Sequence, residues 1–450
     1  MAASQVALKS QSDLLARLEE ARARTDAIYD SLPPNSYYER PIPQRHRLIF
    51  YLGHLEAFDW NLLSGPLGLV TDDAAFDNLF AFGIDPVDCG LPKDTAKDWP
   101  SIVRVETYNA NIRRRLDEAL RKSADSGTTP QGLTDGTFLH VAIEHRLMHA
   151  ETLAYLLHNL PIEKKSLRVR PRAEVQPSPN SRQVEILAGV ATLGLRATPP
   201  RAFGWDNEFG EQQIRVPGFS VNVFPVTNGE YLKFVQVGGY GDASYWKPED
   251  WAWKQSAGIK HPHFWSLKSG ASADDPKAAW EFRTMFGAIP LPAAWPVYVS
   301  HAEASAYAKW AGKKLPTEAQ WHRAAYGTPE GIERPYPWGR SAPEPRHGNF
   351  HHQRWDATAV DAHPDGQSAF GVFDLLGNGW EWTSTAFGPL PGFEPFSFYP
   401  GYSANFFDGK HFVMKGGSAR TDACMLRRSF RNWFQPHYPY IYSKFRCVED

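Results

Sequence analysis

A change of sequence pattern near the middle of the chain constrains its fold more than any other feature. Up to residue 165, apolar side chains recur every three to four positions among charged ones, whereas later residues form short alternating runs broken by Gly, Pro and Asn. Tryptophan follows the same division, since only Trp60 and Trp99 precede residue 165 and the other 14 follow residue 200. The chain has 450 residues, enough for two or three domains, and the two patterns predict different folds for its halves.

The first half predicts a bundle of four amphipathic helices over residues 1–165. Leu14, Leu18 and Ala21 illustrate the spacing, which places apolar side chains on one face of a helix. Because an isolated amphipathic helix must bury that face, four of them together indicate a four-helix bundle. The helical segments are 8–30, 44–64, 99–122 and 132–160.

The second half predicts a separate α+β domain with much irregular loop. A stretch rich in Pro, Ser and Arg, without helical periodicity, is typical of a linker, which we place at 166–185. The domain itself is expected at 186–450, with short strands and two helices. These helices are predicted at 301–311 and near 317–325.

Charge and cysteine content argue against several classes of protein. The 48 Lys and Arg residues balance 50 Asp and Glu residues, so the chain lacks the basic surplus of a general nucleic-acid binder. Cys89, Cys424 and Cys447 are too widely spaced for a disulfide framework or a thiolate zinc site, which favours a reducing compartment. No signal-peptide core or membrane-spanning apolar run is visible. We therefore expect a cytoplasmic protein that binds neither nucleic acid nor membranes.

Two histidines in the last helical segment have the spacing of metal ligands. His145 and His149 lie four residues apart, which places both imidazoles on one face of a helix. The HExxH motif of zinc proteases is absent because position 146 is Arg, so the general-base carboxylate is missing. His54 interrupts an apolar helix and is the best candidate for a third ligand, since a bundle could bring it beside the pair.

Three neutral imidazoles suit more than one metal, and each also has a purely structural explanation. Iron(II) occupies open sites at which dioxygen and a substrate bind together, whereas zinc with three histidines suits hydrolysis or thiol activation. A histidine on an apolar helix face is also often a hydrogen-bonded core residue. Glu56, Glu144 and Glu151 lie close in sequence and could supply a carboxylate ligand or accept hydrogen bonds from the imidazoles, of which we expect the second.

Motifs in both halves resemble known families. The second half contains the motifs KKLPTEAQWHRAA (313–325), FGVFDLLGNGWEWTSTAF (370–387), VMKGGSARTD (413–422) and FRNWF (430–434). With these motifs it resembles the formylglycine-generating, sulfatase-modifying family, which has a C-type-lectin-like α+β fold. The first half, with its three histidines, looks like the DinB-type four-helix bundle. This domain order, together with FGWDNEFG at 203–210, is similar to that of the ergothioneine-biosynthesis sulfoxide synthases.

The resemblance implies a non-haem iron enzyme. In that family, three histidines at positions matching His54, His145 and His149 bind iron(II), and dioxygen is used to join a sulfur donor to the imidazole C2 of hercynine, yielding a sulfoxide. The resemblance therefore favours metal ligation by these histidines over a purely structural role in the core. Trp380 and Trp382 of GNGWEWT recur in relatives with unrelated activities and are expected to pack the core.

The resemblance also implies substrate contacts in the second half. Hercynine carries a trimethylammonium group, which an aromatic face suits, and Trp433 matches the family's position for that contact. Asn432 matches the neighbouring polar contact. The tyrosine that some members use as a proton donor corresponds to the region of Tyr399 and Tyr402, where phenylalanines also fall.

Departures from the family pattern concern the donor. Where actinobacterial members have an acidic residue after the Asn-Trp pair, this chain has Phe434, and the loop 80–94 contains none of the arginines that help to hold γ-glutamylcysteine. Met148 stands where a Gln is common, so a polar contact to the hercynine cation is lost. Arg428 and Arg431 are the remaining candidates for donor contacts. The donor is therefore expected to be a thiol or, as in a selenoneine-forming branch, a selenosugar.

Two other functions remain open. Formylglycine generation on a protein needs a reactive cysteine pair near the GGS segment, and only Cys424 lies there, with Cys447 23 residues further on. The alternative is a non-catalytic lectin-like protein whose histidines are structural or bind zinc.

Overall fold

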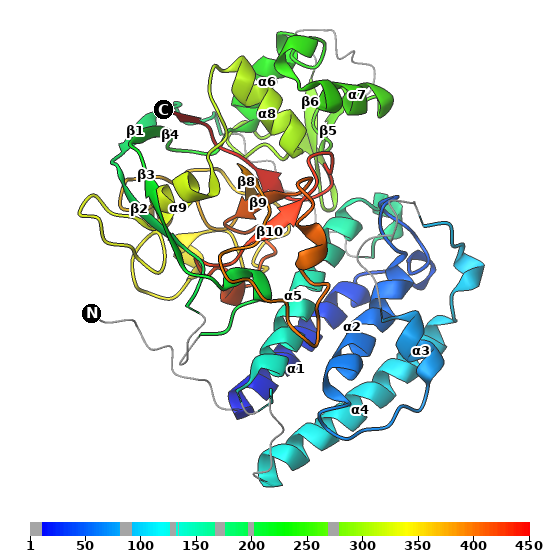
Figure 1. Cartoon of the computed structure of the whole chain (residues 1–450). Coiled ribbons are helices and arrows are strands. Elements are labelled where there is room, and N and C mark those ends of the chain that lie inside the picture. Colours follow the sequence, from blue (N-terminus) through cyan, green and yellow to red (C-terminus); the bar gives the residue numbers. More distant parts are fainter. Residues whose placement is uncertain are drawn as a thin grey trace. The chain divides into compact units, whose positions relative to one another are not determined.

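The computed structural model divides into two units, Met1–Val169 and Arg170–Asp450 (Figure 1). The structure describes residues 11–81, 92–126, 132–133, 135–166, 176–196, 202–268 and 279–450. Residues 167–175 of the predicted linker, Cys89 and most of the loop 80–94 lie outside these ranges.

The first unit is the expected helical domain. Three of the four predicted segments contain one long helix each, and the helix predicted at 99–122 extends to Ser126. A short further helix, α3, was not predicted because six residues are too few to show a period. Its helices are α1 (Gln11–Asp30), α2 (Leu48–Leu63), α3 (Ala74–Leu79), α4 (Ile102–Ser126) and α5 (Thr137–His158).

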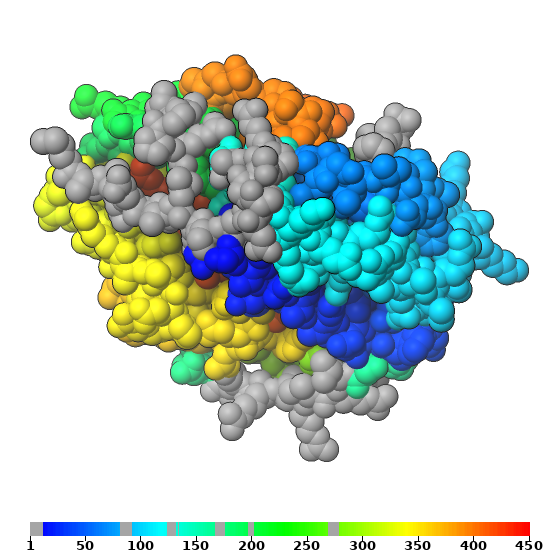
Figure 2. Space-filling model, turned by 90° about the horizontal axis from the view of Figure 1, so that it is seen from below, coloured from blue at the N-terminus to red at the C-terminus, as the bar shows by residue number. Residues whose placement is uncertain are grey.

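Helices α2 and α5 form the centre of this unit. Both are buried around most of their circumference and pack against each other, while α1 packs on α5 and α4 packs on α2. Figure 2 shows α1, in dark blue, beside the cyan α4 on the surface. The buried Arg22 of α1 joins the two helices, since its Nη1 lies 2.6 Å from Oδ1 of Asp117. Because α2 and α5 are buried on nearly all sides, their polar side chains need partners inside the protein.

The second unit has the predicted α+β composition. Helices α8 and α9 correspond to the two helices expected from sequence, whereas α6 and α7 were not expected. The helices are α6 (Asn228–Gln236), α7 (Pro248–Ser256), α8 (His301–Trp310) and α9 (Glu318–Tyr326). The strands are β1 (Gln183–Ile186), β2 (Gly189–Leu193), β3 (Gln212–Val216), β4 (Phe219–Asn222), β5 (Trp265–Leu267), β6 (Trp280–Thr284), β7 (Gly287–Pro290), β8 (Trp380–Ala386), β9 (Phe412–Lys415), β10 (Asn432–Phe434), β11 (Ser443–Lys444) and β12 (Val448–Glu449).

Small sheets and long connections build this unit. A four-stranded sheet has the order β10-β9-β8-β11, in which β8 and β11 are parallel and the other neighbours antiparallel. Strand β12, near the end of the chain, pairs with β4, so distant parts of the sequence close one sheet. The pairing of β9 with β10 sets Trp433 opposite Val413.

Local sequence signals explain where the short helices begin. Thr227, Ser300 and Thr317 accept hydrogen bonds from backbone N–H groups at the starts of α6, α8 and α9, each in a capping box with a Glu or Gln three residues later. The expectation for the GNGWEWT motif is confirmed, because Trp380 and Trp382 are both buried.

Among the described residues, no helix is both long enough and apolar enough to span a membrane.

Candidate metal centre and substrate-binding residues

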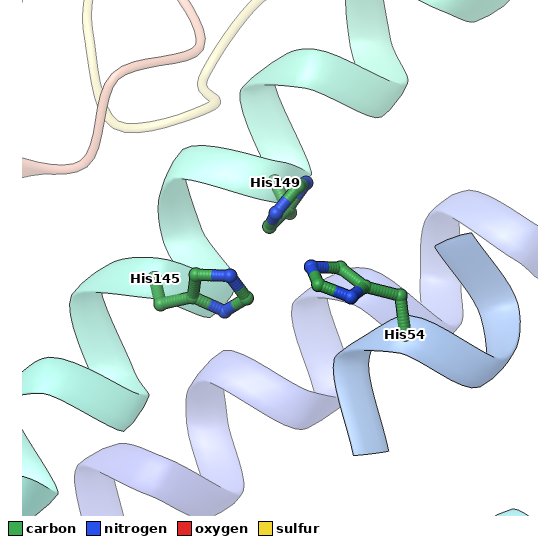
Figure 3. Close-up of side chains that lie close together, drawn as sticks. All are labelled: His54, His145 and His149. Atoms are coloured by element: carbon green, nitrogen blue, oxygen red, sulfur yellow. The ribbon is translucent and has the colours of Figure 1, made fainter. Parts of the chain in front are cut away.

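Three histidines converge in the centre of the helical unit, as Figure 3 shows. His54 extends from α2, and His145 and His149 extend from successive turns of α5. One ring nitrogen of each lies within 4.8 Å of a ring nitrogen of the others. The structure therefore brings together the three side chains that the sequence analysis selected.

The environment of these histidines keeps them neutral. Each has at most 3% of its surface exposed. Burial lowers the pKa of His54 to about 4 and holds the pKa of His145 and His149 well below the ordinary value. A neutral imidazole is the form that binds metal, so no proton has to be displaced at neutral pH.

The ring nitrogens also fit a metal ion in their hydrogen bonding. Within the described part of the chain, Nε2 of His54 and both ring nitrogens of His145 and His149 are buried without a hydrogen-bond partner. Buried polar atoms left unpaired cost free energy, and one metal ion bound at the cluster would satisfy a nitrogen of each imidazole. The residues present therefore fit a divalent metal with three nitrogen ligands.

A backbone carbonyl selects the tautomer of His54. The oxygen of Phe80 lies 2.7 Å from Nδ1, so Nδ1–H donates to it and Nε2 is left as the metal-facing acceptor. Gly53 makes this approach possible, since a Cβ on that residue would lie 2.6 Å from the Phe80 ring. A side-chain pattern cannot reveal this contact, because the acceptor belongs to the backbone.

Aromatic rings surround the imidazoles. Phe58 stacks on His145 with ring centroids 3.4 Å apart, and Phe50 stacks on His54 at 5.0 Å. Phe50, His54 and Phe58 follow one another at four-residue intervals on α2, a helical spacing that could have identified the two phenylalanines from sequence.

The expected role of Glu56 is wrong. Its carboxylate accepts hydrogen bonds from two guanidinium groups, Arg146 at 2.9 Å and Arg113 at 2.9 Å, rather than from an imidazole. Arg146 is fully buried and also lies 2.7 Å from Asp59, so it ties α5 to α2. The residue that removes the protease motif thus serves as a structural clamp between the two helices that carry the histidines.

Trp433 lies within a cluster of aromatic rings in the second unit. Its half-buried indole stacks on Phe387 with centroids 4.1 Å apart and planes 7° apart. Tyr402 meets it edge-on at 5.5 Å, and Phe406 is tilted toward it at 5.5 Å. Grouped aromatic faces attract quaternary ammonium groups, so this cluster has the composition of a cation site.

Both tyrosines expected as proton donors belong to the same neighbourhood. Tyr402 contacts Trp433, and Tyr399 lies 5.5 Å from Tyr402. Burial, with the charge of Asp206 second, raises the pKa of Tyr399 to about 12, so its hydroxyl keeps its proton at neutral pH. Trp205 of the FGWDNEFG motif stacks on Tyr402 with ring centroids 4.0 Å apart and so packs against this region.

The two arginines expected to contact the donor differ in their environment. Arg431 is buried. Its guanidinium donates hydrogen bonds to both carboxylate oxygens of Glu318, at 3.0 and 3.1 Å, and to the carbonyl oxygen of Gly388 at 2.9 Å. Arg428 has a longer contact of 3.3 Å to Glu333, and 28% of its side chain is exposed. Arg428 is therefore the more accessible of the two cations.

The remaining predicted contacts are half-buried. Asn432 accepts a hydrogen bond from the backbone N–H of Trp433 at 2.8 Å, and Phe434 stacks on Tyr438 at 5.2 Å. Met148 lies on α5, one residue before His149. All of these side chains retain some exposed surface.

Sequence comparison assigns both units to families. Residues 169–450 match the family described as sulfatase-modifying factor enzyme 1-like domain. The chain belongs to this sulfatase-modifying factor family. Residues 17–153 match the DinB superfamily, which confirms the predicted combination of domains.

Several relatives of this chain carry names that state an activity or a pathway. Hercynine oxygenase from Mycolicibacterium smegmatis is 35% identical over 69% of this chain and 71% of its own length. Hercynine oxygenase from Mycobacterium tuberculosis is 40% identical over 54% of this chain and 56% of its own. Ergothioneine biosynthesis protein 1 from Neurospora crassa is 28% identical over 93% of this chain. The matches span about half the length of the last two relatives, 56% and 55%.

Proposed function

We propose that this protein is a hercynine oxygenase that holds iron(II) on His54, His145 and His149 and uses dioxygen to form a carbon–chalcogen bond at the imidazole C2 of hercynine. One observation carries the proposal, namely the buried cluster of three neutral histidines without hydrogen-bond partners on the metal-facing nitrogens. The names of its relatives supply the substrate.

The chain's own residues prepare the metal site. Bound iron(II) with three protein ligands would supply open positions for dioxygen and the donor. The Phe80 carbonyl holds His54 in the ligating tautomer, and Phe50 and Phe58 exclude water from the faces of the imidazoles. These contacts fix the direction of the ligating nitrogens before the metal binds.

Trp433 would hold the trimethylammonium group of hercynine. A quaternary ammonium has no N–H to donate, so the faces of aromatic rings, such as the indole of Trp433 and the neighbouring rings of Tyr402 and Phe406, suit it better than polar groups do. Asn432 would supply the adjacent polar contact, and Met148 replaces a hydrogen-bonding side chain with an apolar one. Hercynine recognition would therefore depend on aromatic contacts more than on hydrogen bonds.

Tyr399 and Tyr402 are the candidates for proton donor. The raised pKa of Tyr399, caused by burial and then by Asp206, keeps its proton available at neutral pH. Tyr402 is closer to Trp433, at 5.5 Å. Replacing each by Phe separates the two, because only the donor's loss should divert turnover from carbon–sulfur bond formation to thiol oxidation.

The donor is the least constrained part of the proposal. Phe434 and the exposed part of Arg428 are the described residues that would distinguish donors, since Arg431 is already occupied by Glu318. Two versions follow, one with cysteine or γ-glutamylcysteine and one with a selenosugar.

The test is to incubate the iron-loaded chain with hercynine, oxygen and each donor in turn, with product mass as the readout. A product combining hercynine with one donor supports the proposal and identifies the donor. Consumption of no hercynine with any donor, by protein containing stoichiometric iron, would refute it. His140→Ala is a matched control, because His140 is half-buried on α5 outside the cluster.

Formylglycine generation is the competing activity that the family assignment keeps open. Of the two cysteines in the described residues, Cys447 is buried, and burial raises the pKa of its thiol to about 12, which makes it a poor nucleophile. Under our proposal, Cys424→Ser retains hercynine turnover, whereas a cysteine-based oxidase would lose its activity. Stoichiometric zinc in place of iron, with no turnover, would instead favour the lectin-like binding protein.

A further inference from the structure

A cavity of about 780 Å³ lies on the second unit among β3, α8 and the start of α9. Ser305, Ala308 and Gly312 line it along one side, where small side chains at helical spacing leave room. A Cβ added at Gly312 would meet nothing within 4 Å. The volume falls within the range of about 300–1,000 Å³ that is common for small-molecule sites.

The charge of this cavity differs from that of the chain. Overall the protein has a formal net charge of −2, yet the charged side chains of the lining are five basic and one acidic. They are Arg215, Lys247, Lys309, Lys313, Lys314 and Asp450. Concave surfaces lined by charges of one sign concentrate counter-ions, so the cavity favours an anion.

Three of these cations lack a carboxylate in direct contact within the described residues, although Lys247 Nζ lies 5.8 Å from the centroid of the Phe412 ring and the charge of Lys309 helps to lower the pKa of Asp242. Lys313 pairs with Glu449 at 3.0 Å, and Lys314 pairs with Asp450. Arg215, Lys247 and Lys309 form no ion pair with any residue that the structure describes. The uncompensated charge of the lining is therefore about three units.

The floor of the cavity is apolar. Val216 and Leu315 line it and are buried, and the ring of Phe412 lies beside them, stacked on His301 at 3.8 Å. A ligand that filled the cavity would therefore place a hydrophobic part on this floor while its charges faced the basic rim.

We propose that this cavity binds a small organic diphosphate, with the chemistry of a nucleoside diphosphate. A diphosphate ester carries about three negative charges at neutral pH, since the second pKa of a terminal phosphate is about 6. That charge matches the three unpaired cations, and the fork of Arg215 suits phosphate oxygens. The attached ring and sugar would occupy the apolar floor.

Calorimetric titration of the full chain with three probes tests the proposal. ADP should bind saturably, pyrophosphate should bind more weakly by at least about tenfold, and adenosine should show no binding, because both the charge and the apolar part contribute. Equal affinity for pyrophosphate and ADP, or no saturable binding of ADP, would overturn it. Displacement of ADP by hexaglutamate, added at the same total concentration of negative charge, would also overturn the proposal, because it would indicate a site for acidic protein segments.

Charge-reversal variants locate the binding. Lys309→Glu and Arg215→Glu should each weaken ADP binding by at least about tenfold. The control is Lys233→Glu, the same charge change at an exposed position of α6 outside the cavity, which should leave ADP affinity within about twofold. Equal weakening in the control would contradict the site. Iron content should be unchanged in all three variants, so this result is independent of the proposed oxygenase activity.

Discussion

The two units hold their candidate functional residues in different ways. In the helical unit, three histidines project from two helices that are buried on most sides and tied together by Arg146. In the second unit, Trp433 lies on a three-residue strand, and its neighbours Tyr402 and Phe406 come from a turn and from the short 3-10 helix Ala404–Phe406. Regular backbone positions the first group, whereas ring stacking positions the second.

This difference has a consequence for sensitivity to substitution. A metal site depends on the direction of each nitrogen, so small displacements of α2 or α5 should weaken it strongly. An aromatic cluster offers several faces to a cation, and the loss of one ring leaves others. The variants below test whether the helical unit is indeed the more sensitive of the two.

The largest effect is expected at the metal site itself. His145→Ala should remove stoichiometric iron, with affinity lowered by more than about a hundredfold, because even outer-shell partners cost 10- to 100-fold. Metal analysis of the purified protein measures this, with His140→Ala as the control on the same helix. Unchanged metal content in His145→Ala would mean that the cluster is structural.

Arg146→Met should destabilise the helical unit by about 3–5 kcal/mol, because it leaves the buried carboxylate of Asp59 with only a 3.9 Å contact to Arg22 and that of Glu56 with Arg113 alone. Urea unfolding followed by circular dichroism gives the value. Arg114→Met is the comparison, since its exposed pair with Glu118 should be worth less than about 1 kcal/mol. If both variants lost a similar free energy of unfolding, the buried ion pairs of Arg146 would contribute no more to stability than an exposed pair does.

Gly53→Ala should lower metal affinity by about 10- to 100-fold without unfolding α2, because the new methyl group displaces Phe80 and its carbonyl from His54. Nitrogen NMR of the metal-free protein should then show loss of the Nδ1–H tautomer. Adding Phe80→Ala to this variant should restore the tautomer, since it removes the colliding ring and keeps the backbone carbonyl. A full Nδ1–H signal in the single variant would contradict the assignment.

The smallest effect is expected in the aromatic cluster. Trp433→Leu should raise the KM for hercynine by about tenfold, in line with one desolvated cation–π contact, while iron content stays unchanged. Trp251→Leu, at a half-buried indole of α7 outside the cluster, is the control. A loss larger than that of Gly53→Ala would reverse the ranking of the two units.

Sequence patterns alone were enough to predict the division into a helical and an α+β half, the four long helices and the metal-ligand spacing on α5. These are local properties, because a helix repeats every 3.6 residues and its apolar positions show in the sequence. The pairing of His54 with His145 and His149 needed either the resemblance or the fold, since 91 residues separate His54 from His145.

The surroundings of those residues could be identified only in the folded protein. The Phe80 carbonyl that orients His54 is a backbone group with no side-chain signal, and Glu56 turned from the imidazoles to Arg146 because a buried guanidinium requires carboxylate partners. The same holds for the basic cavity, whose lining comes from six separate segments between Ile214 and Asp450. Such contacts depend on packing between distant segments, which a one-dimensional pattern does not contain.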